Sequence, residues 1–520
     1  MDFQNRFDIQ NIVVRFLLPV IGCIAAAMAT VYMMQEVNPL AACCVCLSVV
    51  LFAVAVVSPR AGLVILLFVS AYSDLVKRML VLWGDLSLEQ VGYVLATAPF
   101  VVAGLFVAVI TRWAFHRVEI KLRDMLLLAG IGVVTIVSFL LAKRAGGGVM
   151  ENLKAAANNG LYMLLMPIAL KLVDTPEDVG RFLRYARLIF IPVALYGIFQ
   201  AIFGLADFEI AYLRTGLTMM VKELFDVRPR AFSTLNAAST FGAISAMLSM
   251  LALYPWFVRD RNASEVGERM KSYSLMLLYI AATFASVARA SFVVLVVAFF
   301  AYWCFASARR TRIFYVTAIT LYAALLATSS YLLDHIAEWD PANNVQSEFA
   351  GQMLRTQTYT ERLRGFYNLT HSTDMYSWFG LPEAQKMTET TWNHDPVSSI
   401  LVDTGVVGLA VVVVALVLAL VFFHRRLLSL PHGYQRTTAL MLLALDAGLL
   451  AGHALFHALL GAFPLNVFFW LFAGMLAFLL LYKPAGEPAA EASPERPAWM
   501  PRLTPETVPP LRGARVRLRR

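Results

Sequence analysis

The sequence has little charge and lacks any stretch that resembles a soluble domain. Of its 520 residues only 15% are Asp, Glu, Lys or Arg, whereas 59% are hydrophobic and the mean hydropathy is +0.68. These values exclude an ordinary soluble enzyme and indicate a polytopic membrane protein. The sequence also has no Gly-rich phosphate loop and no sustained internal repeat.

Cysteine is scarce as well. The five cysteines all fall inside apolar stretches: Cys23, Cys43, Cys44, Cys46 and Cys304. We interpret them as small buried hydrophobic residues, and we expect no structural disulfide, no metal site and no cofactor.

Apolar segments near the ~20-residue length of a transmembrane helix recur along most of the chain. The third and sixth are the most polar, so we expect about twelve to fourteen helices. The segments are 11–33, 39–57, 61–80, 91–111, 124–142, 156–173, 181–204, 231–256, 271–287, 289–307, 312–333, 399–423, 438–460 and 464–482.

The positions of Lys and Arg predict the orientation, because cytoplasmic loops are enriched in these residues. With the N-terminus inside, most of the 43 Lys and Arg lie on the cytoplasmic side. The polar stretch 334–398 is then external. This asymmetry and the basic tail account for the net charge of +9, so the charge does not indicate nucleic-acid binding.

We therefore predict an all-α polytopic membrane bundle in four parts. Residues 1–333 form the N-terminal part of the bundle, 334–398 a large external loop with short helices, and 399–482 the C-terminal transmembrane helices. Residues 483–520 are rich in proline and arginine and are expected to form a disordered cytoplasmic tail.

Several arginines lie on the predicted external side, although Lys and Arg are normally enriched in cytoplasmic loops. Arg214, Arg228 and Arg230 precede the expected span at 231, and Arg289 falls in a very short connection at the membrane boundary. Such residues can be solvated, or can extend from a helix end to lipid phosphate. Alternatively they bind an anionic head group, because guanidinium holds phosphate oxygens bidentately.

His394 lies where the external loop re-enters the membrane, within the string WNHDPVSSILVDTGVVGL. A lone loop histidine is commonly surface decoration. A neutral imidazole at this boundary can also act as a general base toward an attacking hydroxyl.

The spacing of the residues around His394 forms a recognisable pattern. Arg362 is followed by Phe366 and Gly380, and His394 by Asp403 and Gly405. Upstream, RAFSTLNAASTFG begins at Arg230, and Arg289 opens the triplet Arg-Ala-Ser. Together, residues 225–480 resemble the O-antigen ligase and Wzy-type polymerase superfamily of bacterial membrane glycosyltransferases. Phe366 stands where that family usually has Trp, and Asp395 where it usually has Asn.

The resemblance implies a bacterial inner-membrane glycosyltransferase with cytoplasmic termini and a periplasmic active site. Its donor would be an undecaprenyl-pyrophosphate-linked glycan and its acceptor a glycan or lipid A core, with no metal. His394 would be the general base of an inverting transfer, and Arg289, Arg362 and Arg230 would stabilise the pyrophosphate. Residues of a second rank are Arg228, Arg364, Arg214 and Asp403, the last of which could instead cap or orient the re-entering helix. A polysaccharide flippase and a chain-length regulator are further expected partners, besides the lipid bilayer.

Three functions stay open at the level of sequence. The first is a polymerase that joins lipid-linked repeat units in exopolysaccharide, capsule or O-antigen assembly. The second is a ligase that moves a finished glycan to lipid A core or protein. The third is a polysaccharide flippase or transporter, for which broken helices and midplane charges are expected. Asp446, His453 and His457 share one helix face, which we interpret as polar packing inside the bundle.

Overall fold

The computed structural model of the chain describes residues 38–115, 160–216, 230–258, 266–338, 356–371, 377–378, 396–455 and 461–482. Within these ranges all regular elements are helices and no strand occurs, which confirms the prediction of an all-α bundle. The chain divides into two units, Met1–Leu481 and Tyr482–Arg520, and every helix in the described ranges belongs to the first. The expected spans 11–33 and 124–142 and the tail 483–520 lie outside the described residues.

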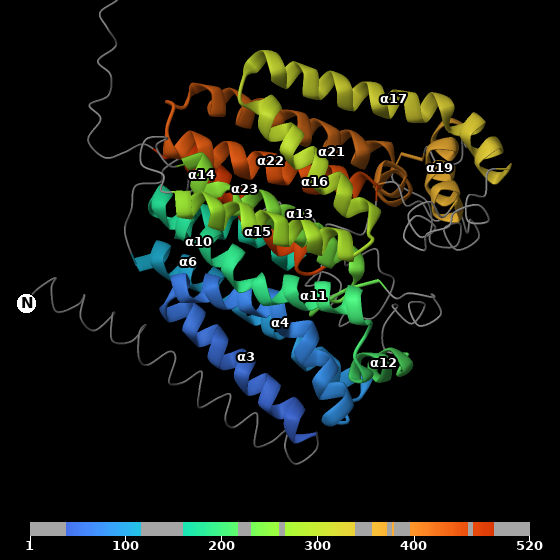
Figure 1. Ribbon diagram of the computed structural model, residues 1–520. Helices are drawn as coiled ribbons and strands as arrows, with labels where there is room; N and C mark the ends of the chain where they lie inside the picture. The colour runs from blue at the N-terminus through green and yellow to red at the C-terminus, as the bar shows by residue number, and fades with distance from the viewer. Residues whose placement is uncertain are drawn as a thin grey trace, which may run out of the picture. The chain divides into compact units, whose positions relative to one another are not determined.

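Figure 1 shows the helices of the first unit lying roughly side by side as a bundle. In chain order they are α3 (Pro39–Val57), α4 (Pro59–Trp83), α5 (Leu88–Leu95), α6 (Thr97–Phe115), η2 (Leu161–Leu164), α9 (Leu165–Leu172), α10 (Pro176–Ile189), α11 (Ile191–Phe203), α12 (Asp207–Arg214), α13 (Ala238–Ala252), α14 (Tyr254–Val258), α15 (Val266–Ala285), α16 (Arg289–Phe305), α17 (Ala308–Glu338), α19 (Thr356–His371), α21 (Pro396–Ser429), α22 (Tyr434–Leu455) and α23 (Leu465–Leu481).

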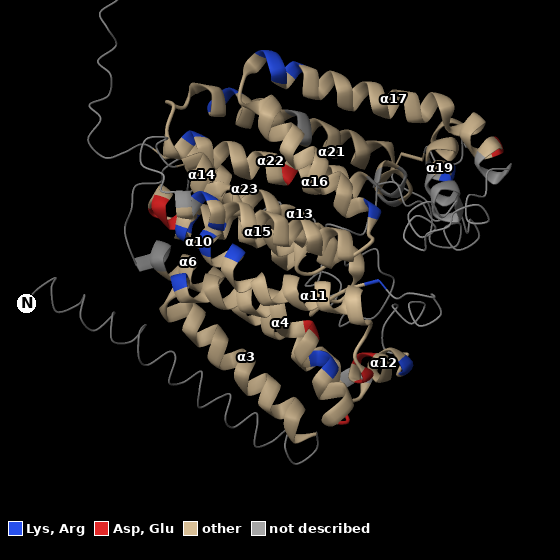
Figure 2. Cartoon of the chain, viewed as in Figure 1, with Lys and Arg blue, Asp and Glu red and all other residues tan. Residues whose placement is uncertain are grey.

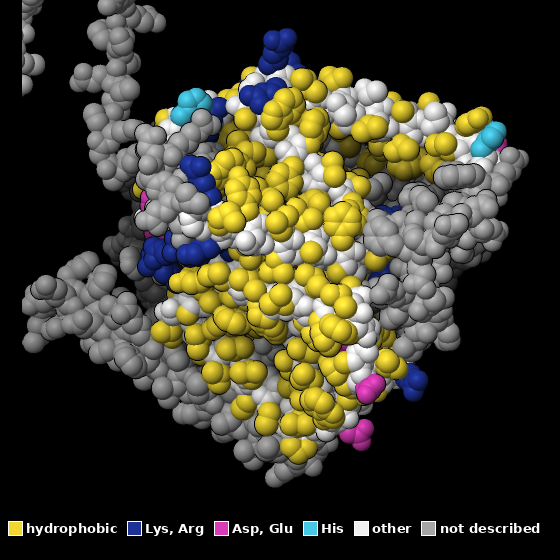
Figure 3. All heavy atoms as spheres, viewed as in Figure 1, with side chains coloured by type: hydrophobic (Ala, Val, Ile, Leu, Met, Phe, Trp, Pro, Cys, Tyr) yellow, Lys and Arg dark blue, Asp and Glu magenta, His cyan; other side chains and the backbone are white. Residues whose placement is uncertain are grey.

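The described residues contain 7 helices that are long and apolar enough to cross a membrane, and three shorter apolar helices. The length and composition of these helices therefore confirm the prediction of a membrane-embedded protein. Hydrophobic side chains cover most of the face drawn in Figure 3, over α11, α15 and α16, with Lys and Arg gathered toward one end of the bundle. Such a surface is suited to lipid, because apolar side chains meet acyl chains without a desolvation cost.

Helix α13 is the centre of the bundle. Almost all of its residues are buried, and it packs against α15, α16 and α22. Its sequence, ASTFGAISAMLSMLA, is rich in Ala, Ser and Gly, which let neighbouring helices approach closely. By contrast α17 and the second part of α21 lie at the periphery, with 6% and 0% of their most apolar stretches buried. The small side chains of α13 thus suit its central position.

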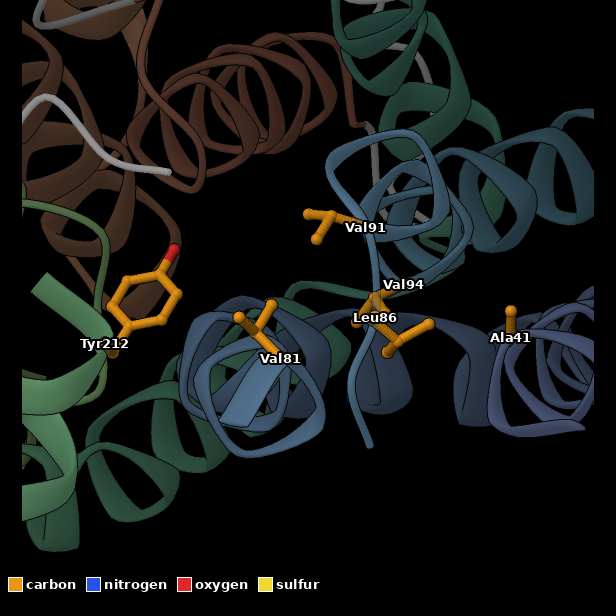
Figure 4. Packing of buried hydrophobic residues seen from close by; sticks show 6 residues of the cluster. All are labelled: Ala41, Val81, Leu86, Val91, Val94 and Tyr212. Carbon is orange, nitrogen blue, oxygen red and sulfur yellow. The ribbon is translucent and has the colours of Figure 1, made fainter. Parts of the chain in front are cut away.

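A smaller apolar cluster joins the first helices to α12. Ala41 of α3, Val81 of α4 and Tyr212 of α12 belong to it, and α5 with the turn before it contributes Leu86, Val91 and Val94 (Figure 4). Helix α5 begins at a capping box formed by Ser87 and Gln90. This packing connects the end of α4 to α12, a helix that also packs on the start of α13 through Leu213 and Ala238.

Three details of the expected helices need correction. The span predicted at 231–256 is wrong at its start, because residues 231–237 are not helical and α13 begins only at Ala238. In the span expected at 156–173, the described part is a 3-10 turn, η2, followed by the short α9. Finally Cys43, expected to be buried, is exposed on α3.

The polar third span is a single long helix, α4, in spite of Asp74, Lys77 and Arg78. At its start, Arg60 Nη2 lies 3.3 Å from Asp174 Oδ2, just before α10. At its other end, Arg78 reaches the segment that precedes α13. The rise of a helix separates these two positions by about 27 Å, close to the thickness of a bilayer core.

The two ends of the bundle differ in charge. In Figure 2, Lys and Arg on the described helices gather mainly at the end where α10, α14 and the start of α17 lie. The other end carries α12 and α19 (Figure 1). The predicted orientation requires one end of the bundle to be richer in Lys and Arg than the other. Which end faces the cytoplasm stays a prediction.

Candidate functional site

Residues 231–237 form a non-helical segment that leads into α13 and is buried from Ala231 to Leu235; we call it the 231–237 segment. Ser233 has a positive φ of 55°, a conformation that a helix cannot contain. Its Oγ donates to the Val193 carbonyl at 2.6 Å, and Thr234 Oγ1 donates to the Ala71 carbonyl at 2.6 Å. Side-chain bonds to α4 and α11 therefore replace the helical hydrogen bonds of this segment.

Arg78 of α4 is the main anchor of the segment. Its side chain is 2% exposed, and its Nη1 donates to the Ser233 carbonyl at 2.7 Å. Nη2 donates to the Leu235 carbonyl, and the guanidinium carbon lies 4.5 Å from the centre of the Phe232 ring. The planar fork of arginine suits this arrangement, because its donors can reach two carbonyls at once.

Glu209 of α12 balances the charge of Arg78. Its Oε1 lies 3.4 Å from Arg78 Nη1 and accepts a 2.6 Å hydrogen bond from Gln200 Nε2. Burial raises the pKa of the Glu209 carboxyl, and the amide of Ala206 and the Arg78 guanidinium oppose that rise. Removing one partner of a buried ion pair typically costs about 3–5 kcal/mol, so the pair fixes both helices in place.

Gln200 of α11 completes what we call the Arg78 cluster, which consists of Arg78, Gln200 and Glu209. Gln200 Oε1 accepts the backbone N–H groups of Phe232 and Ser233 at 3.1 and 2.6 Å. The cluster thus satisfies two backbone N–H groups and two carbonyls of the 231–237 segment. Such satisfaction is needed because unpaired backbone groups are costly in a buried site.

The first turn of α13 meets the first turn of α16. Ser291 Oγ donates to the Ser239 carbonyl at 3.4 Å. A Cβ at Gly242 would lie closer than van der Waals contact to the hydroxyls of Ser286 and Ser291, so only glycine fits there. The two upstream strings that resemble the glycosyltransferase superfamily, one beginning at Arg230 and the other at Arg289, are therefore in direct contact.

Both helices begin without a side-chain cap. The N-cap residues are Ala237 and Ala288, which have no side-chain oxygen for the amides of the first turn. Helix N-termini carry a partial positive charge and attract anions. Arg289, the first residue of α16, is partly buried and adds a full positive charge beside them. The two helix starts and Arg289 together therefore make this part of the bundle suitable for an anion.

A second pair of strings also comes together, in the long polar stretch. Helix α19 packs on α17 through Phe366, whose ring centre lies 5.7 Å from that of Tyr322 in an edge-on arrangement. Leu369 of α19 packs against Leu401 of α21. The string that contains Phe366 thus touches the string that contains Asp403 and Gly405.

Helix α21 is broken at Gly405, which has φ 72° and ψ −174°. Only glycine adopts this conformation without strain. After the break, the N–H of Val406 donates to the Ser377 carbonyl at 2.9 Å, and that of Val407 to the Trp378 carbonyl at 3.3 Å. The break precedes most of the apolar stretch at Thr404–Ser429, so it belongs to the loop end of the helix.

The structure places the predicted site residues unevenly. Arg289 and Arg230 are partly buried, whereas Arg214 ends α12 and Arg364 lies on α19, both exposed. Arg362 and Asp403 lie within α19 and α21, but their side chains are outside the described part, as are His394 and Arg228 altogether. The roles assigned to these residues stay predictions.

Sequence reasoning missed the Arg78 cluster and the paired helix starts. One signal for the cluster was present, because Asp74, Lys77 and Arg78 made the third span unusually polar. Intramembrane charges are functional or structural by default, and here Arg78 is paired through a distant residue, Glu209. The pairing itself depends on tertiary contacts and leaves no pattern in the sequence.

Asp446 of α22 is buried, and its Oδ1 has no hydrogen-bond partner among the residues that the structure describes. His453, two turns later, is partly exposed, and His457 lies outside the described part. Among the described residues, no group of three His, Cys, Asp or Glu could hold a metal ion. The interpretation of the Asp446 face as polar packing stays a prediction.

No family model, curated protein or solved structure matches the chain.

Proposed function

We propose that the chain is a membrane glycosyltransferase that polymerises undecaprenyl-pyrophosphate-linked oligosaccharide units. The observation that carries the proposal is the contact between the uncapped first turns of α13 and α16, with Arg289 at the start of α16. Two helix N-termini and a guanidinium at one end of a membrane bundle suit a lipid-linked pyrophosphate.

The chemistry is an inverting transfer. His394 takes the proton of the acceptor hydroxyl, and that oxygen forms a bond to C1 of the donor sugar. The bond from C1 to the pyrophosphate oxygen breaks, and undecaprenyl pyrophosphate leaves with the bonding electrons. Arg289, Arg230 and Arg362 stabilise the negative charge that develops on the leaving group. No metal takes part in this scheme.

The remaining residues have supporting roles in the proposal. The break at Gly405 sets the direction in which the stretch after His394 enters the bundle, and Asp403 lies at the end of the short helix before the break. The exposed Arg364 and Arg214, together with Arg228, serve approach of the anionic donor rather than the reacting bond. The site faces the periplasm if the more cationic end of the bundle is cytoplasmic.

Binding of the lipid pyrophosphate tests the proposed site directly. Native mass spectrometry of the purified protein in nanodiscs would compare undecaprenyl pyrophosphate with undecaprenol. We expect saturable binding of the pyrophosphate lipid, and binding weaker by on the order of tenfold or more in Arg289→Gln, because a charged hydrogen bond is lost. Arg60→Gln is the matched control, since Arg60 is exposed and pairs with Asp174 and Asp178. Equal retention of both lipids by the wild-type protein would contradict the proposal.

A further inference from the structure

We infer that Arg78 is a positioning residue for the proposed pyrophosphate site. It would act by fixing the 231–237 segment and, through it, the first turn of α13. The inference rests on the proposed function, since it names the residue that holds one of the two helix starts in place. Arg78 lies outside the sequence patterns around Arg230, Arg289 and His394.

Arg78 is unable to contact a ligand itself. Its side chain is 2% exposed, and its donors are directed to Glu209 and to two carbonyls of the 231–237 segment. The face of its guanidinium is covered by Phe232. A buried charge that is fully engaged in this way shapes its surroundings instead of binding a substrate.

The path from Arg78 to the proposed site is short. Leu235, whose carbonyl accepts from Arg78, lies three residues before Ala238, the first residue of α13. Leu213 of α12 belongs to one apolar cluster with Phe232 and Ala238, so α12 packs on both the segment and the start of α13. A shift of the segment therefore moves the amides of α13 relative to Arg289.

Side chains of two neighbouring helices hold the 231–237 segment along most of its length. Phe232 and Ser233 donate their amides to Gln200, Ser233 and Thr234 donate hydroxyls to Val193 and Ala71, and two carbonyls accept from Arg78. These bonds come from both α4 and α11. Binding sites are held by such supporting shells, because small displacements of an anion site weaken it strongly.

The test combines a binding measurement with a local structural measurement. Arg78→Gln and Arg78→Lys would be compared with the wild type for binding of undecaprenyl pyrophosphate in nanodiscs and for amide hydrogen exchange at residues 232 and 233. We expect Arg78→Gln to raise exchange there and to weaken binding by about tenfold, because buried carbonyls lose a charged donor. Arg78→Lys should give exchange and binding values between those of the wild type and Arg78→Gln, since an ammonium keeps the charge but lacks the planar fork of arginine.

Arg60→Gln, at the opposite end of α4, is the control and should change neither quantity. Thr234→Val is the milder variant for the case that Arg78→Gln does not fold, because it removes only the bond to Ala71 and keeps the shape. Thr234→Val should also raise amide exchange at residues 232 and 233 and weaken lipid binding, but by less than Arg78→Gln does.

Two results would overturn the inference. Unchanged exchange at residues 232 and 233 in a folded Arg78→Gln protein would show that Arg78 does not hold the segment. Raised exchange with unchanged affinity would show that the segment does not position the site. If instead the wild-type protein fails to bind the pyrophosphate lipid, the proposed function fails, which is a distinct outcome.

Discussion

His394 is the residue on which the proposed chemistry depends most. His394→Ala should lower transfer by on the order of a hundred- to ten-thousandfold, because the acceptor hydroxyl loses its base. Donor binding should persist, since the arginines and helix starts are untouched. Both quantities can be measured on the same reconstituted preparation.

The control for His394→Ala is His371→Ala. His371 lies in the same polar stretch, is exposed at the end of α19, and stacks on Tyr367 with ring centres 4.1 Å apart. It should retain transfer. Wild-type turnover in a well-folded His394→Ala protein would end the assignment of a general base to this residue.

Gly242 is required by the close approach of α13 to the turn before α16. Gly242→Ala should destabilise the protein by about 1–3 kcal/mol, because the added methyl group overlaps the hydroxyls of Ser286 and Ser291. Gly92→Ala provides the matched control, since a Cβ there would meet nothing within 4 Å. The midpoints of thermal unfolding in detergent would be compared between Gly242→Ala and Gly92→Ala. Equal midpoints would mean that α13 and α16 do not pack as closely as Gly242 indicates.

At the scale of the elements, the break in α21 separates a short loop helix from the long apolar part. Gly405→Ala should cost about 1–3 kcal/mol, because a side chain is strained at φ 72° and ψ −174°. Transfer should fall more than stability does, since in the proposed mechanism the break sets the direction of the stretch that follows His394. Gly267→Ala, at an open position of α15, is the control for stability. Full activity in Gly405→Ala would show that the break has no part in catalysis.

The helices themselves were largely predictable, because long apolar runs have few alternatives in a bilayer. The expected segments 39–57 and 464–482 agree with α3 and α23 within one residue at each end. The 231–237 segment was not predictable in this way. Its sequence, AFSTLNA, runs without a break into the apolar sequence of α13, and its non-helical path is fixed by Arg78 and Gln200 from other helices.

The candidate site was predictable only in part, for a related reason. Spacing and residue type singled out Arg230 and Arg289, and the structure brings their two strings into contact through Ser239 and Ser291. Which strings meet is decided by tertiary packing around Gly242. A single sequence carries no record of such contacts.

At the scale of the whole molecule, the charge asymmetry predicts the orientation of the bundle. A membrane-impermeant thiol reagent applied to intact cells, with the outer membrane permeabilised, should label Ala211→Cys on α12 and leave Ala308→Cys on α17 unlabelled. Both positions are exposed, and they lie at the two different ends of the bundle. The native cysteines lie within apolar spans, and labelling of the wild-type protein measures their contribution. Labelling of Ala308→Cys alone would reverse the orientation and place the proposed site in the cytoplasm.

The most direct test of a polymerase is reconstitution of the purified protein with undecaprenyl-pyrophosphate oligosaccharide as the sole substrate, beside the His394→Ala protein. We expect a ladder of products on a gel, separated by one repeat unit, that is lost in the variant. A single product that forms only after a second acceptor is added would contradict polymerisation and indicate a ligase. No transfer with or without that acceptor would contradict a glycosyltransferase altogether.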